Sequence, residues 1–110
     1  MFGGLLLLMD IKDLTERMHV FVRSKGWYEP SSSRPQTQRN LAISLSLEAN
    51  EVLEHFQWQT DLKDRDEFAS ELADVGLYLL QLASVSEVDL EQAILKKLEI
   101  NASRTWDEKP

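Results

Sequence analysis

Two pairs of acidic residues are the side chains in this sequence best suited to chemistry. Glu48 and Glu51 form a Glu-x-x-Glu pair, and Glu71 and Asp74 form a Glu-x-x-Asp pair after nineteen intervening residues. Both pairs lie in strongly helical patterns, and residues three apart share one face of a helix. Four carboxylates on neighbouring helices would repel one another unless a cation lies among them. Hard divalent cations such as magnesium take oxygen ligands of this kind.

The residues around these pairs favour a metal site over a solvated acidic face. At about 100° per residue, Glu48 and Glu51 fall between a broad apolar arc and a second, smaller apolar strip. The arc consists of Leu41, Leu45, Ala49, Val52, Leu53 and Phe56, and the second strip consists of Ile43, Leu47 and Trp58. Acidic pairs on helices are usually solvated. Carboxylates with apolar residues on both sides are instead usually paired or bound to metal.

The composition restricts both the architecture and the partners. At 110 residues, the chain is long enough for one domain with a real core. It has no cysteine, which excludes disulfides and thiolate chemistry and is compatible with a cytoplasmic location. A net charge of −7 without a basic patch makes a nucleic-acid polymer a poor partner. A small phosphorylated ligand is compatible with this charge if metal ions neutralise the site.

The first nine residues resemble an extension placed before the first helix. They lack the basic region and the cleavage pattern of a signal peptide, and they are too short to span a membrane. We expect residues 1–9 to be poorly ordered or packed against a partner, and we expect no membrane association.

Helical periodicity predicts four amphipathic helices, at residues 10–25, 37–59, 64–85 and 89–106. Asp10 is a candidate N-cap of the first helix, and Gly26 is a candidate C-terminal stop. The one long loop, residues 26–38, carries two prolines and three serines, which disfavour helix. Four helices with mostly short connections predict an all-α four-helix bundle. The domain is expected at residues 10–106, followed by a tail at 107–110.

Several segments around the acidic pairs match a known pattern. Arg39-Asn40-Leu41-Ala42 and His55-Phe56-Gln57-Trp58 flank the first pair, and the later segments are Asp74-Val75-Gly76-Leu77-Tyr78-Leu79 and Lys97-Leu98-Glu99-Ile100-Asn101-x-x-Arg104. In this order, they resemble the MazG-like all-α nucleoside triphosphate pyrophosphohydrolases, and in particular the short members similar to dCTP pyrophosphatases. The resemblance spans about residues 10–106. Some members carry a histidine just before the Arg-Asn, where this chain has Gln36 and Thr37.

The resemblance implies an oligomeric all-α enzyme that hydrolyses nucleoside triphosphates such as dCTP to the monophosphate and pyrophosphate. Family members are dimers or tetramers with the site at a subunit interface, and the implied task is house-cleaning of nucleotide pools. The implied metal ligands, for magnesium or manganese as a substitute, are Glu48, Glu51, Glu71 and Asp74. Glu51 would take the proton from the attacking water. The implied substrate contacts are Lys97, Asn101 and Arg104 to phosphate or sugar, Tyr78 to the sugar, and Trp58 and Trp27 to the base.

Two other functions compete with this one. A di-iron carboxylate bundle needs Glu-x-x-His pairs, but His55 follows Glu51 at four residues rather than three. A non-catalytic helical oligomeric interaction module, with a vestigial or regulatory metal site, is the other alternative. The sequence leaves this second alternative open.

Overall fold

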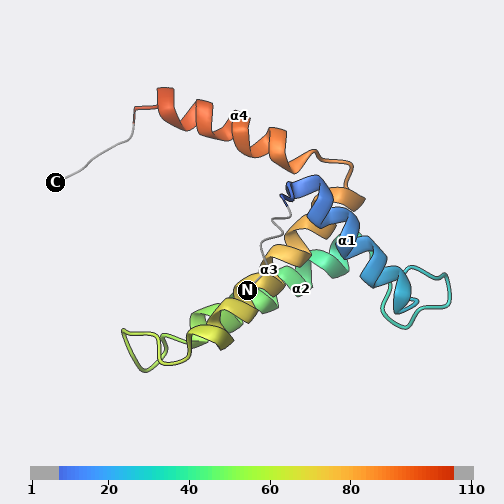
Figure 1. The fold of residues 1–110 in the computed structure, drawn as a ribbon, viewed down its shortest axis with the longest axis horizontal. Coiled ribbons are helices and arrows are strands. Elements are labelled where there is room, and N and C mark those ends of the chain that lie inside the picture. Colours follow the sequence, from blue (N-terminus) through green and yellow to red (C-terminus); the bar gives the residue numbers. More distant parts are fainter. Residues whose placement is uncertain (1–7, 106–110) are drawn as a thin grey trace.

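The structure, a computed structural model, describes residues 8–105, and in that range it contains helices and no strand. The helices are α1 (Ile11–Ser24), α2 (Gln38–Glu54), α3 (Arg65–Val85) and α4 (Leu90–Ser103), as Figure 1 shows. The predicted all-α fold of four helices is therefore confirmed. Most of the expected N-terminal extension (residues 1–7), Trp106 and the expected tail (107–110) lie outside the described residues.

Each helix begins where a short polar side chain caps it. Asp10, Thr37, Asp64 and Asp89 each accept a hydrogen bond from the backbone N–H three residues later. These bonds satisfy amide groups that the first helical turn leaves without a partner. Gly26 follows α1 with φ of 72°, a left-handed conformation that glycine adopts without strain. The predicted cap at Asp10 and stop at Gly26 are confirmed.

The second helix is shorter than its periodicity predicts. It ends at Glu54 rather than at residue 59, and residues 55–58 form turns and bends. The rings of His55 and Phe56 pack edge-on against Phe68 of α3, with centroids 5.4 and 5.7 Å apart. The prediction was wrong here because these contacts across the fold favour a turn, and local sequence does not report them. The fourth helix likewise ends at Ser103, before the predicted residue 106.

The third helix is the centre of the fold, because both α1 and α2 pack against it. Met18, Val22 and Leu41 are the buried apolar side chains of the described residues, and Gln81 of α3 is buried beside them. By length and composition alone, α3 is the one helix within residues 8–105 that could cross a membrane, and 6% of its apolar window is buried.

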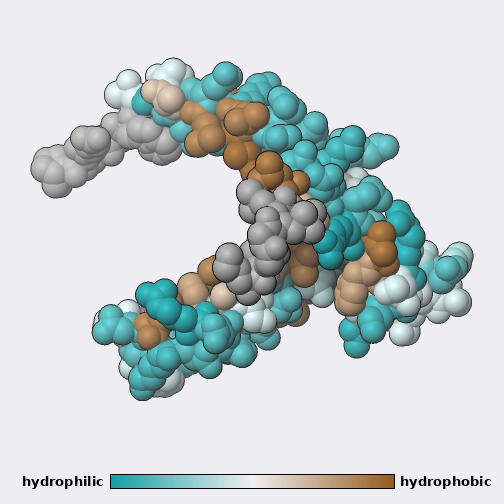
Figure 2. Space-filling view, viewed as in Figure 1, coloured by the Kyte–Doolittle hydropathy of each residue, from teal (hydrophilic) through white to brown (hydrophobic). Residues whose placement is uncertain are grey.

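The fourth helix stands apart from the other three. It leaves the end of α3 and extends away from α1 and α2 (Figure 1). The radius of gyration is 17.3 Å, against about 13 Å for a compact chain of this length. Figure 2 shows a hollow beside α4, with apolar side chains along the face of the helix that borders it. Leu95 and Leu98 of α4 are 50% and 60% exposed, so its apolar face lacks cover within residues 8–105.

Candidate active site

The packing of α2 against α3 brings the four predicted carboxylates together. Glu48 from α2 is half-buried, as are Glu71 and Asp74 from α3, whereas Glu51 is exposed. The negative charges of Glu51, Asp74 and Glu71 all act on the Glu48 carboxyl. The two acidic pairs of the sequence therefore form one cluster across the α2–α3 interface.

Glu48 shows how strongly the cluster lacks positive charge. Its pKa is raised from 4.5 to about 7. The largest cause is a side-chain hydrogen bond with Glu51, which needs a proton on one of the two carboxyls. Burial is the next cause, followed by repulsion from Glu51, Asp74 and Glu71. A carboxyl that holds its proton near neutral pH marks a place where a cation would be stabilised.

Two oxygens of the cluster are buried without a hydrogen bond. Glu48 Oε2 and Glu71 Oε2 have no hydrogen-bond partner among the described residues. His55 Nε2 lies 3.0 Å from Glu71 Oε2, so a protonated His55 would form an ion pair with this oxygen. Buried acceptors of this kind are costly and are usually satisfied by a donor or an ion. The cluster thus fits a divalent cation by the chemistry of its donors and by its unsatisfied oxygens.

The side chains are not yet arranged around such an ion. Within residues 8–105, no group of three or more acidic or histidine side chains is positioned to hold a metal. Cation binding would require the carboxylates to turn inward.

A cavity of about 780 Å³ adjoins the cluster. It lies among α1, α2, α3 and the loop at residues 26–37, and Asp74 is part of its wall. Pockets for small molecules and cofactors commonly have volumes of about 300–1,000 Å³. Its place beside the carboxylates makes this cavity the candidate substrate pocket.

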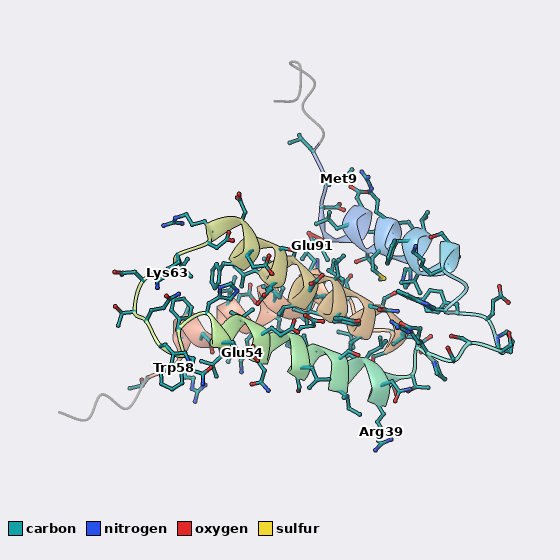
Figure 3. All side chains as sticks on the ribbon, turned by 90° about the horizontal axis from the view of Figure 1, so that it is seen from below. Met9, Arg39, Glu54, Trp58, Lys63 and Glu91 are labelled. Carbon is teal, nitrogen blue, oxygen red and sulfur yellow. The ribbon has the colours of Figure 1, made fainter. Side chains whose placement is uncertain are left out.

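The two predicted tryptophan contacts lie in different places. Trp27 and Tyr78 both line the cavity, and the guanidinium of Arg34 lies 5.5 Å from the centroid of the Trp27 ring. Trp58 is 89% exposed and lies with Lys63 at the other end of the α2–α3 pair from Arg39 (Figure 3). The structure therefore brings Trp27 and Tyr78 to one pocket and leaves Trp58 outside it.

The predicted phosphate contacts also lie away from the carboxylates of their own chain. Lys97 and Asn101 belong to α4, and Arg104 follows its last turn. Because α4 extends away from α2 and α3 (Figure 1), these side chains do not join the acidic cluster within one chain. Asn101 Oδ1 is buried and has no hydrogen-bond partner among the described residues.

Sequence reasoning missed Gln81, which lies in the cavity wall and is 3% exposed. Its amide nitrogen donates to Gln36 Oε1 over 2.8 Å and to the Tyr28 hydroxyl over 3.2 Å. A signal was available, because Asp74, Tyr78 and Gln81 are spaced at i, i+4 and i+7, which places them on one face of a helix. Sequence reasoning placed His55 in a family segment and weighed it as an iron ligand, but it did not pair His55 with Glu71, which lies beside it.

One Glu-x-x-His pair is present, at Glu16 and His19, but it does not form a di-iron site. His19 Nδ1 lies 2.7 Å from the Tyr28 hydroxyl, and His19 Nε2 lies 2.7 Å from Ser84 Oγ. Both ring nitrogens are thus engaged within the fold, which leaves no lone pair directed at a metal.

Comparison with known proteins identifies the family. A family model described as MazG-like matches residues 43–109. The chain belongs to the MazG-like family. Relatives include dCTP pyrophosphatase 1 from Mus musculus and from Homo sapiens, 39% and 40% identical over 75 residues. These alignments cover 60% of this chain and 44% of each relative, so the chain spans less than half the length of these proteins. A solved pyrophosphatase from Archaeoglobus fulgidus is 31% identical and superposes with a TM-score of 0.71, covering 89% of this chain and 94% of that one.

The part that matches the MazG-like model contains the whole acidic cluster. It begins at Ile43, within α2, and continues through α3 and α4. The loop residues Trp27 and Gln36, which line the cavity, precede it. The carboxylates therefore lie inside the region that matches the family model, whereas the loop side of the pocket lies outside it.

Proposed function

We propose that this MazG-like protein is a magnesium-dependent nucleoside triphosphate pyrophosphohydrolase. Its substrates would be nucleoside triphosphates such as dCTP, and its products the monophosphate and pyrophosphate. The observation that carries the proposal is the cluster of four carboxylates, two of whose buried oxygens accept no hydrogen bond. One member of the cluster, Asp74, lies in the wall of a cavity of about 780 Å³. The similarity of the chain to relatives named dCTP pyrophosphatase 1 supports the same reaction.

The roles follow from the position of each side chain. Glu48, Glu71 and Asp74, with Glu51 beside them, would hold magnesium, which neutralises phosphate charge and lowers the pKa of bound water. Glu51 is the most exposed of the four, and we assign it as the base that takes the proton from the attacking water. That water would attack the α-phosphorus, and the bond from this phosphorus to the oxygen shared with the β-phosphorus would break, so that pyrophosphate leaves with that oxygen.

The sugar and the base of the nucleotide would lie in the cavity. Tyr78 follows Asp74 by one helical turn on α3, which places it to pack against the sugar next to the phosphates. Trp27 is placed to stack on the base, a contact that is tolerant of base identity. The ligand would thus lie along the pocket, with its phosphates at the acidic cluster and its base at the loop.

We further propose that a second copy of the chain completes the site. Ile43, Leu47 and Trp58, the second strip of the sequence analysis, are 46%, 60% and 89% exposed. The apolar face of α4 is uncovered as well. Exposed apolar surface on this scale usually marks an interface, and association would let Lys97, Asn101, Arg104 and Trp58 serve the site of a neighbouring chain.

The protein should accordingly sediment as a dimer or tetramer of its 12.7 kDa chain. A double variant with Leu47→Glu and Leu98→Glu places charges on both exposed faces and should shift the mass to the monomer. Turnover should fall as the mass falls, because α4 of one chain would then no longer supply phosphate contacts to the site of another chain. Multi-angle light scattering and activity at the same concentration measure both effects.

Val20→Glu is the matched control, since Val20 is 60% exposed on α1, which carries no part of the two faces. It should leave mass and activity unchanged. A wild-type protein that is monomeric at micromolar concentration and fully active would contradict the shared site.

The function itself is tested with a panel of nucleoside triphosphates and magnesium. The expected products are the monophosphate and pyrophosphate, separated from nucleoside diphosphate by ion-exchange chromatography. Binding of nucleotide without turnover would favour the interaction module instead. Release of inorganic phosphate and a nucleoside diphosphate would show cleavage between the β- and γ-phosphates and would contradict the proposed reaction.

A further inference from the structure

The wall of the cavity contains a chain of hydrogen bonds whose direction is fixed at one end. Gln36 Nε2 lies 2.6 Å from the backbone carbonyl of Arg34. A carbonyl oxygen can only accept, so the nitrogen of the Gln36 amide must face it. Gln36 Oε1 is then directed at Gln81, and it accepts from Gln81 Nε2 over 2.8 Å.

The same logic fixes the far end of the chain. Gln81 Nε2 also donates to the Tyr28 hydroxyl, so the Tyr28 proton is free to be donated to His19 Nδ1 at 2.7 Å. His19 then carries its own proton on Nε2 and donates to Ser84 Oγ. This neutral tautomer agrees with the pKa of His19, which burial and then the charge of Arg23 hold below its usual value.

One hydrogen-bond acceptor of this network has no donor among the described residues. Both protons of Gln81 Nε2 are used, whereas Gln81 Oε1 accepts no hydrogen bond from residues 8–105. Gln81 is 3% exposed, and the space that it lines is the cavity. The network holds this oxygen in place, because rotating the amide would break both donor bonds.

We propose that Gln81 selects the base of the substrate, with Gln36 as the residue that positions it. Gln81 Oε1 accepts a hydrogen bond from an exocyclic amino group, so the cavity favours cytosine or adenine over uracil or hypoxanthine. A carbonyl at the same place on the base would bring two acceptors together, and a buried acceptor would remain unpaired. This inference rests on the proposed function and adds the base class that the function leaves open.

The test uses pairs of substrates that exchange this amino group for a carbonyl. The wild-type protein should hydrolyse dCTP with a kcat/KM at least about tenfold above that for dUTP, or dATP above dITP by the same factor. Gln81→Met keeps the length and removes the acceptor, so the ratio should fall to about one. The loss should arise mainly through KM for the amino substrate.

Two further variants separate recognition from folding. Gln36→Met leaves Gln81 in place but frees its amide to rotate, so the ratio should fall while the melting temperature stays within a few degrees. Gln92→Met is the matched control, because Gln92 is exposed on α4, away from the cavity, and it should keep the wild-type ratio. An unchanged ratio in folded Gln81→Met would overturn the proposal.

An equilibrium measurement keeps this result independent of catalysis. Calorimetric titration of the wild-type protein should show tighter binding of dCMP than of dUMP, or of dAMP than of dIMP, and Gln81→Met should remove the difference. Hydrolysis of all substrates without such selectivity would refute the role of Gln81 and leave the proposed function standing. Selective monophosphate binding without any hydrolysis would refute the function and leave the role of Gln81 standing.

Discussion

Glu48→Gln will reduce turnover by at least about 100-fold, since even residues that only orient metal ligands cost roughly 10- to 100-fold when replaced. The change keeps the shape of the side chain and removes one charge from the cluster. It also removes an oxygen that is buried without a partner, which the proposed mechanism assigns to the metal. Steady-state hydrolysis of dCTP at saturating magnesium measures the loss.

The same substitution will make the metal-free protein more stable above neutral pH. The pKa of Glu48 is raised in the folded state from 4.5 to about 7, so folding favours its protonated form. Below pH 4.5 the residue is protonated in both states and carries no penalty, and stability is lost as the pH rises through 7. Glutamine never ionises and avoids this loss. At pH 8 the variant should therefore melt several degrees higher, since 1 kcal/mol corresponds to about 4–8 °C in a domain of this size.

Glu54→Gln is the matched control, because Glu54 is an exposed glutamate at the end of the same helix (Figure 3). It should change neither turnover nor the pH dependence of melting. If the cluster were an architectural ion-pair network, Glu48→Gln would instead lower the melting temperature at pH 8 and leave turnover per folded molecule unchanged.

Removal of divalent cations will abolish activity completely and reversibly. Excess chelator should stop hydrolysis, and added magnesium or manganese should restore it, because the donors are all hard oxygens. Magnesium should also raise the melting temperature, since a ligand that binds only the folded state stabilises it by mass action. Differential scanning fluorimetry across a magnesium titration gives this second readout without substrate.

The rise in melting temperature should be much smaller in Glu48→Gln, which links the thermal effect to this cluster rather than to general salt effects. Full hydrolysis in excess chelator would remove the metal from the mechanism. A rise of equal size in wild type and variant would place the ion elsewhere on the protein.

Local signals in the sequence were enough to predict where the helices begin. Asp10 and Gly26 were recognised as the ends of α1 because caps and stops depend on a few adjacent residues. The acidic pairs were also found by spacing alone, since Glu-x-x-Glu and Glu-x-x-Asp define one face of a helix. Family resemblance then indicated that the two faces meet, and in the structure the charges of Glu51, Asp74 and Glu71 all act on the Glu48 carboxyl.

Other features depended on contacts between distant residues. α2 ends early because His55 and Phe56 pack on Phe68, and the periodicity of α2 contains no trace of that contact. Gln36 and Gln81 are 45 residues apart, and no local pattern pairs them. The separation of α4 from the other helices was equally hidden, because an apolar stripe indicates that a helix is covered but does not say by which surface.

The separation of α4 has a consequence for dilute protein. A helix of 14 residues with little tertiary support is only marginally stable in water, so α4 needs a covering surface to keep its order. In the proposed assembly that surface belongs to another chain, and the cations of α4 become ordered only when the two chains meet. Specific activity would then rise with protein concentration, and the amount of protein present would set how much of it is able to work.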